Sequence, residues 1–200
     1  MPSAAGNDAT KHIPEAPDGK PTSMLQTRVQ RNEHPRRRLG CTVLITLRTI
    51  DPDDPRNGSV LTVETDHAAR PALPGGAAYP GEPIGVAAAR GLLEGTGLRR
   101  TITWALLVDQ VPGDARGLEA VDVVCEGGSL TEAEAQAMSI PVDALEEIRG
   151  LVWIRPNQLV HTLEPHQAGR VRSALAARES GQGIPLLNAG TPHLGSTGTP

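Results

Sequence analysis

The chain has 200 residues, a length that fits one domain of ordinary size. Its composition, 38% hydrophobic and 21% charged, is typical of a globular protein, and no apolar run is long enough to span a membrane. The formal net charge of -4 argues against a general nucleic-acid binder, which needs a basic surface to displace counterions. We therefore expect a cytoplasmic protein with no nucleic acid and no membrane among its partners.

Two terminal stretches differ in composition from the middle of the chain. Residues 1–38 contain few apolar residues and end in an arginine-rich run. A solvated approach to the first strand is the simpler interpretation of this run, and contact with phosphates is the alternative. Residues 189–200 are rich in Gly, Thr and Pro. We expect both stretches to be disordered tails that flank one domain, residues 39–188.

The first half of the domain predicts a hairpin, a loop and a helix. Residues 41–50 and 59–65 are rich in β-branched residues, as strands are, and Asn57-Gly58 between them is a strong turn signal. A Pro- and Gly-rich loop then leads to a helical pattern over residues 83–94.

The second half of the domain alternates strands with helices. Strands are expected over 101–110, 121–126 and 150–154, and helical segments over 131–138, 142–147, 156–161 and 165–178. Strands that first pair and then alternate with helices predict a mixed sheet with helices on its faces. Cys41 and Cys125 lie in apolar, strand-like stretches, where a free cysteine behaves as a small hydrophobic residue.

One long pattern in the loop and the helix that follows it points to a chemistry. The stretch that begins Leu73-Pro-Gly-Gly resembles the Nudix box, which is Gly, five residues, Glu, seven residues, then Arg-Glu-aliphatic-x-Glu-Glu-x-Gly-aliphatic. The residues that match at the right spacing are Gly76, Glu82, Arg90, Leu92, Glu94, Gly97 and Leu98. Gly91 and Gly95 stand where the pattern has glutamate.

The resemblance implies a fold and an activity. It extends over about residues 39–188 and implies an α/β protein with the Nudix fold, an α/β/α sandwich with a mixed β-sheet. The family's activity is to cleave a diphosphate bond in nucleoside-diphosphate-linked compounds with Mg²⁺ or Mn²⁺, and its members often form homodimers. By resemblance, the Gly76 carbonyl and Glu94 meet the metal, Arg90 holds the glutamates in place, and Glu82 supports the start of the helix.

The two missing glutamates weaken the expected metal site. Positions 91, 94 and 95 share one helix face, where three carboxylates would suit Mg²⁺. Only Glu94 remains. By resemblance, a further carboxylate comes from the loop before the late strand; Glu146 and Glu147 precede Trp153 at about that distance, with Glu147 the better match, and with Gly76, Glu82 and Glu94 it would form a weakened site. Mg²⁺ can bind through one or two carboxylates plus phosphates and waters.

Each of these residues also has a simpler explanation. Glu82 would favour the positive end of the helix, Arg90 would pair with Glu94 one turn later, and Gly95 would help Gly97 to end the helix. Two hypotheses therefore stay open. The kept spacing favours a Nudix-type hydrolase with a divergent metal site. The lost glutamates favour a non-hydrolytic ligand-binding or regulatory protein, or an enzyme repurposed for a biosynthetic step.

Overall fold

The structure is a computed structural model that describes residues 37–113, 118–181 and 184–192. The predicted tails therefore lie outside the described residues over 1–36 and 193–200, together with most of the arginine-rich run. No helix in the described part of the chain is long and apolar enough to cross a membrane.

The predicted strands and helical segments occur in the expected order, and β3, β7 and β8 are additional strands. The strands are β1 (Arg38–Arg48), β2 (Val60–Thr65), β3 (Gly75–Ala77), β4 (Ala105–Val111), β5 (Ala120–Thr131), β6 (Ile148–Ile154), β7 (Leu186–Asn188) and β8 (Thr191–Pro192). The helical segments are α2 (Ile84–Thr96), α3 (Glu132–Gln136), η1 (Val142–Ala144), η2 (Pro156–Gln158), α4 (Leu159–Thr162) and α5 (Pro165–Ser180).

The described strands form one sheet of mixed direction, as the sequence predicts. Its order is β6-β2-β1-β5-β4-β7-β8, and β3 pairs with β1 beside this path. The β1–β5 and β4–β7 pairs are parallel, and the other pairs are antiparallel. β1 pairs with β3 over Gly40–Thr42 and with β2 at Thr46. The loop that begins the glycine-rich pattern, residues 76–98, is therefore held against the centre of the sheet.

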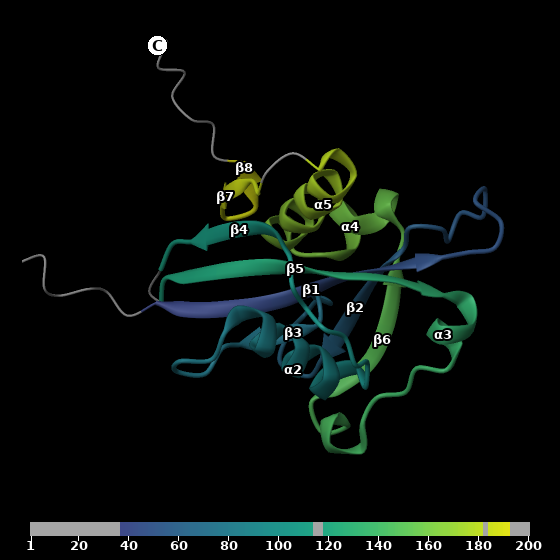
Figure 1. Ribbon diagram of the computed structural model, residues 1–200, viewed down its shortest axis with the longest axis horizontal. Helices are drawn as coiled ribbons and strands as arrows, with labels where there is room; N and C mark the ends of the chain where they lie inside the picture. The colour runs from purple at the N-terminus through teal and green to yellow at the C-terminus, as the bar shows by residue number, and fades with distance from the viewer. Residues whose placement is uncertain (1–36, 114–117, 182–183, 193–200) are drawn as a thin grey trace, which may run out of the picture. The chain divides into compact units, whose positions relative to one another are not determined.

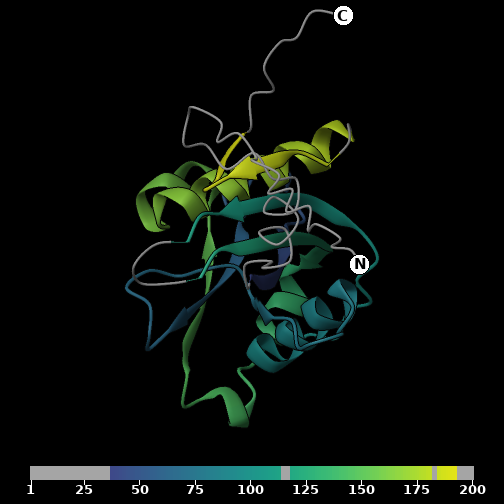
Figure 2. The ribbon, with the colours of Figure 1, turned by 90° about the vertical axis from the view of Figure 1, so that its left-hand side faces the viewer.

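The two faces of the sheet bury two separate cores. Along β1, Val43 and Ile45 point into a core shared with α2, whereas Leu44 points into a core shared with α4 and α5. This alternation follows from the two-residue period of a strand. Figure 1 shows α2 and α5 on opposite sides of the sheet, and Figure 2 shows the same layers after a quarter turn. The expected arrangement of helices on both faces is confirmed.

Local signals set the ends of α2. Pro83 is the N-cap residue, with no side chain capping the first turn, and the helix continues through Thr96. Gly97 closes it in the left-handed region at φ 72°, and its N–H donates to the Leu93 carbonyl. Gly97 therefore ends the helix as predicted, but Gly95 lies inside it and does not. The helix runs two residues beyond the predicted 83–94.

The strand predicted over 101–110 begins later than expected. β4 starts at Ala105 because the segment before it packs across the beginning of α2. There the Ile102 carbonyl oxygen lies so close to Gly85 that an added Cβ would be 2.5 Å from it. The predicted helix over 142–147 is likewise reduced to the short turn η1.

The sheet extends past residue 188, where the sequence places the start of a tail. The Ala189 N–H donates to the Gln110 carbonyl at 3.0 Å, and the Gly190 N–H donates to the Asp109 carboxylate at 3.1 Å. The chain then turns back and pairs β8 with β7. Both anchoring groups lie about eighty residues away in sequence, so local composition carries no sign of this pairing.

Candidate functional site

Two residues that match the glycine-rich pattern, Glu82 and Arg90, form an ion pair that we call the clasp. The Arg90 Nε donates to Glu82 Oε1 at 2.8 Å, and its Nη2 donates to Glu82 Oε2 at 2.8 Å. Nη2 also donates to the Ala77 carbonyl at 3.0 Å, and the guanidinium carbon lies 4.1 Å from the centre of the Tyr79 ring. The clasp therefore fastens α2 to the loop that leaves β3.

In this clasp the Glu82 carboxylate binds both Arg90 on α2 and the loop before the helix. Hydrogen bonds from Arg90, and then from the Tyr79 N–H, lower the pKa of Glu82 to about 2. Both carboxylate oxygens are already bonded to Arg90, and the Tyr79 N–H reaches Oε2 at 2.9 Å. Glu82 therefore acts as a positioning group for the loop, and its oxygens are committed before any metal ion is considered.

Gly91 is buried, and the polypeptide backbone leaves it no space for a side chain. A Cβ at this position would lie 2.8 Å from the Gly75 carbonyl carbon and 2.9 Å from the Gly76 nitrogen. Real Cβ atoms do not approach backbone atoms so closely, so α2 and β3 would have to separate. Glycine therefore permits the close contact between helix and strand, a local gain that the sequence does not reveal.

Gly95 differs from Gly91 in its surroundings. A Cβ here would meet only the Ile148 Cδ1 atom, at 3.2 Å, which is the movable end of a side chain. The backbone of β3 thus excludes a side chain at position 91. At position 95 a side chain would fit after a small movement of Ile148.

Two cavities lie beside the sheet, one of about 440 Å³ and one of about 530 Å³. The larger one adjoins α2. We call this larger one, of about 530 Å³, the box cavity. Its lining residues are Val63, Thr65, Pro74, Gly75, Gly91, Leu93, Glu94, Gly95, Arg99, Pro141, Asp143, Ala144, Glu147 and Ile148. Three carboxylates and one guanidinium thus face one space between α2, η1 and the edge of β6.

The box cavity brings together some of the residues predicted from sequence. Glu94 and Glu147 both line it, although they are far apart in sequence. Gly76 and Glu82 are not among its lining residues; Gly76 instead pairs with Cys41 in the sheet. Asp143 is an additional lining carboxylate that the sequence reasoning missed. Its position four residues before Glu147, in a segment predicted as helical, was a usable signal.

The side chain of Glu94 is held by the same arginine as the clasp. The Arg90 Nη1 donates to Glu94 Oε2 at 3.0 Å, and the Glu94 side chain is 58% exposed. The predicted pairing one helical turn apart is confirmed. Arg90 thus links the loop, through Glu82, to the one box glutamate that lines the cavity.

The donor set of the box cavity fits a cation shared with a ligand. Within residues 37–113, 118–181 and 184–192, no group of three or more His, Cys, Asp or Glu side chains is placed to hold a metal ion. Mg²⁺ can nevertheless bind through one or two carboxylates when phosphate oxygens complete its shell. Glu94 and Glu147 supply hard oxygen donors of that kind.

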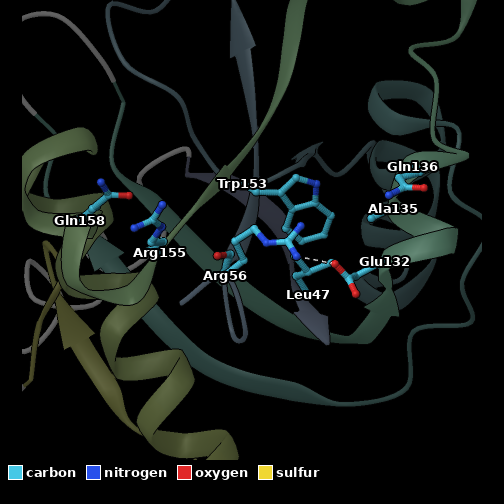
Figure 3. A pocket seen from close by; sticks show the side chains of 9 residues that line it. Leu47, Arg56, Glu132, Ala135, Gln136, Trp153, Arg155 and Gln158 are labelled. Carbon is cyan, nitrogen blue, oxygen red and sulfur yellow. Dashed lines mark hydrogen bonds and ion pairs between the residues drawn. The ribbon is translucent and has the colours of Figure 1, made fainter. Parts of the chain in front are cut away.

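A second cavity, of about 440 Å³, lies around the only tryptophan of β6. We call it the Trp153 cavity; its lining residues are Leu47, Arg56, Ser59, Glu132, Ala135, Gln136, Trp153, Arg155 and Gln158. Figure 3 shows the Trp153 indole in the middle of the cavity, between the two arginines and the α3 residues Ala135 and Gln136. In the sequence, Trp153 marks only the strand that follows Glu147, and no pattern there predicts this cavity.

The two arginines of the Trp153 cavity differ in their bonding. The Arg56 Nη2 donates to Asp54 Oδ2 at 2.6 Å and to Glu132 Oε1 at 2.6 Å, which leaves it balanced by two carboxylates. The Arg155 backbone carbonyl accepts from the Gln158 N–H at 2.9 Å, whereas its exposed side chain forms no hydrogen bond or salt bridge with another side chain among the described residues. Arg155 is therefore available to a ligand, whereas Arg56 is held in place.

Comparison with known proteins gives structural matches only. No family model matches the sequence, and no curated protein does. A MutT protein from Methanosarcina mazei Go1 has a TM-score of 0.52 at 15% identity, covering 75% of this chain and all of its own (100%). The NUDIX domain of Shewanella oneidensis NrtR, complexed with ADP ribose, has a TM-score of 0.53 at 16% identity, covering 76% of this chain and 97% of its own.

A third match is an Ap4A hydrolase from C. elegans, solved as a binary complex. Its TM-score is 0.50 at 15% identity, and the match covers 72% of this chain and 98% of the hydrolase. At such low identities the likeness shows the fold alone.

Proposed function

Starting from the Nudix fold that this chain shares with those structures, we propose that it is a divergent Nudix-type hydrolase. The substrate is a nucleoside-diphosphate-linked compound that binds with Mg²⁺ or Mn²⁺ and is cleaved at its diphosphate. The observation that carries this proposal is that Glu94, Asp143 and Glu147 all line the box cavity. The α/β/α sandwich expected from the sequence is the fold observed.

The charges of the box cavity favour a cation as part of the ligand. Arg99 is the one cationic side chain among its lining residues, against three carboxylates. Two like unit charges about 6 Å apart repel by about 3 kcal/mol at an effective dielectric constant of about 20. A bare diphosphate would meet this repulsion from several carboxylates at once. A diphosphate that carries a divalent cation would instead be attracted.

The chain's own residues have distinct roles in this proposal. Glu94 and Glu147 would hold the cation, which when bound neutralises phosphate oxygens and helps to activate the attacking water. Arg90 is a positioning residue that fixes Glu94 by the 3.0 Å hydrogen bond to its carboxylate. Arg99 is exposed at the cavity and would donate to a phosphate oxygen.

The test is a screen for release of nucleoside monophosphates from ADP-ribose, UDP-glucose, diadenosine polyphosphates and nucleoside triphosphates, each with Mg²⁺ or Mn²⁺. Glu94→Gln and Glu147→Gln should each lower turnover at least tenfold, because each removes a charged metal ligand. Glu146→Gln is the matched control, since Glu146 is adjacent in sequence but does not line the cavity. Turnover that is unchanged in both glutamine variants would sink the proposal.

A second candidate function is ligand binding without hydrolysis, and the packing at Gly91 favours it. A glutamate cannot return there without separating α2 from β3. In this case the same compounds should bind with similar affinity in the presence of EDTA and in the presence of Mg²⁺. Titration calorimetry measures both affinities. Gly95→Glu sharpens the choice, because it adds a carboxylate to the cavity at a position where only the Ile148 side chain must move. Turnover that rises only in this variant supports binding as the natural function.

Three further expectations belong to the same proposal. We propose that the ligand is a small nucleotide-type molecule, that the protein works in the cytoplasm, and that it forms a homodimer. Light scattering coupled to size-exclusion chromatography tests the last of these: a mass of one chain at micromolar concentration contradicts it.

A further inference from the structure

The Trp153 cavity lies at the opposite end of β2 and β6 from the box cavity. In the β2–β6 ladder, Ile148 pairs with Thr65 at the box cavity, and Trp153 pairs with Leu61 further along. Trp153 lies five positions after Ile148 along the strand, or about 16 Å at the usual rise per residue. A single edge strand therefore supplies lining residues to both cavities.

Trp153 has the surroundings of a residue that binds a flat ring. It is partly buried and packs against the core shared with α2, which fixes one side of the indole. The rest of the side chain lines the open cavity. Aromatic residues are scarce, with two Trp, one Tyr and no Phe in the chain, so an indole in a cavity is not a consequence of composition.

The polar groups around the indole suit the edge of a nucleobase. Gln136 and Gln158 each offer an amide that both donates and accepts hydrogen bonds, and Glu132 offers a carboxylate that the Arg56 guanidinium holds at 2.6 Å. Arg155 adds a guanidinium that no described residue binds. Donors and acceptors therefore surround a π-face, which is the combination that base recognition requires.

We propose that the Trp153 cavity binds the aromatic base of the ligand, which stacks on the Trp153 indole. Gln136, Gln158 and Glu132 select the base through its polar edge, and Arg155 donates to an acceptor on the bound nucleotide. This inference rests on the proposed function, since it takes the ligand to be a nucleotide. It adds specificity-determining residues on β6, η2 and α3, outside the glycine-rich pattern.

The test uses the intrinsic fluorescence of Trp153. Trp104 is the other tryptophan and is 75% exposed, so Trp104→Phe leaves Trp153 as the only indole and does not touch the cavity. AMP, GMP and UMP are titrated into this variant, with ribose 5-phosphate as the probe that lacks a base. At least one nucleotide should quench the fluorescence, and ribose 5-phosphate should not.

Two substitutions measure the contribution of the cavity by calorimetry. Trp153→Leu should weaken binding of the quenching nucleotide about tenfold or more, because it removes the stacking surface. Arg155→Gln should weaken it about threefold or more, and it replaces an exposed residue, so it remains informative if Trp153→Leu fails to fold. Arg149→Gln is the control on the same strand, because Arg149 pairs with Asp66 outside the cavity and should leave the affinity unchanged.

The outcomes separate this inference from the proposed function. Equal binding of AMP, GMP, UMP and ribose 5-phosphate, or no binding of any of them, overturns the base-binding cavity. So does an affinity that stays the same in both Trp153→Leu and Arg155→Gln. Diphosphate cleavage that depends on Glu94 but not on Trp153 keeps the hydrolase and rejects this inference. Nucleotide binding through Trp153 with no cleavage of any substrate keeps the base-binding cavity and rejects the hydrolase.

Discussion

On the α5 side of the sheet, the guanidinium of Arg170 is 2% exposed and contacts two buried carboxylates. Its Nη2 lies 2.8 Å from Asp109 Oδ2 and 2.8 Å from Asp122 Oδ2. On the α2 side, the central arginine is Arg90, which is 22% exposed and binds Glu82 at the rim of the molecule. Both arginines join a helix to another part of the fold, but Arg90 also binds Glu94, which lines the box cavity.

The difference separates the part of the molecule that maintains the fold from the part that is free to bind. Arg170 ties α5 to β4 and β5, and through Asp109 it also reaches the Gly190 N–H beside β8. These side chains are almost fully buried, so a lost partner would leave a buried charge uncompensated and this network must be complete. On the α2 side, both the box cavity and the Trp153 cavity remain open. Substitutions on the α5 side should therefore mainly lower stability, and substitutions at the cavities on the α2 side should mainly change binding.

The largest effect is expected at Arg170. Arg170→Met should lower the free energy of unfolding by about 3–5 kcal/mol, because it leaves two buried carboxylates without their cation. Urea unfolding followed by circular dichroism measures it. Arg172→Met on the same helix is the control, since Arg172 is exposed and should change stability by less than about 0.5 kcal/mol. A loss below about 1 kcal/mol at Arg170 would remove the contrast between the two faces.

A smaller loss is expected at Gly91, where the α2 side is closely packed. Gly91→Ala should cost about 1–3 kcal/mol, because the new Cβ meets the Gly75 and Gly76 backbone. Gly95→Ala should stay within about 1 kcal/mol of the wild type, since the helix gains propensity and only the Ile148 side chain must move. The same urea measurement compares the pair. Equal stabilities for the two variants would show that Gly91 is not required by packing.

The smallest effect concerns acid. Because the pKa of Glu82 is lowered from 4.5 to about 2 in the folded protein, its contribution to stability is fully present above about pH 5. That contribution is lost as the pH falls through 4.5 towards 2. Between these pH values the wild type should therefore lose stability more steeply than Glu82→Gln. Unfolding midpoints measured across this range at low salt test it, and parallel curves would contradict the clasp.

Much of the architecture could be predicted from local sequence. The strands β1, β2 and β5 follow β-branched runs, and the ends of α2 follow from Pro83 and Gly97. The same holds for the nearest contacts of the box, such as the pair formed by Arg90 and Glu94 one helical turn apart. These features depend on neighbours in the chain, so the order of residue types is enough to determine them.

The sequence by itself determined the fold class, the position of the box and the loss of two glutamates from it. Only the tertiary structure decided why glycine stands at position 91, which carboxylates share a cavity with Glu94, and that Trp153 lines a cavity of its own. It also decided that residues up to Pro192 join the sheet through Asp109. Each of these depends on backbone or side-chain groups that are remote in sequence, and the distance between two such groups is fixed only when sheet and helices pack together.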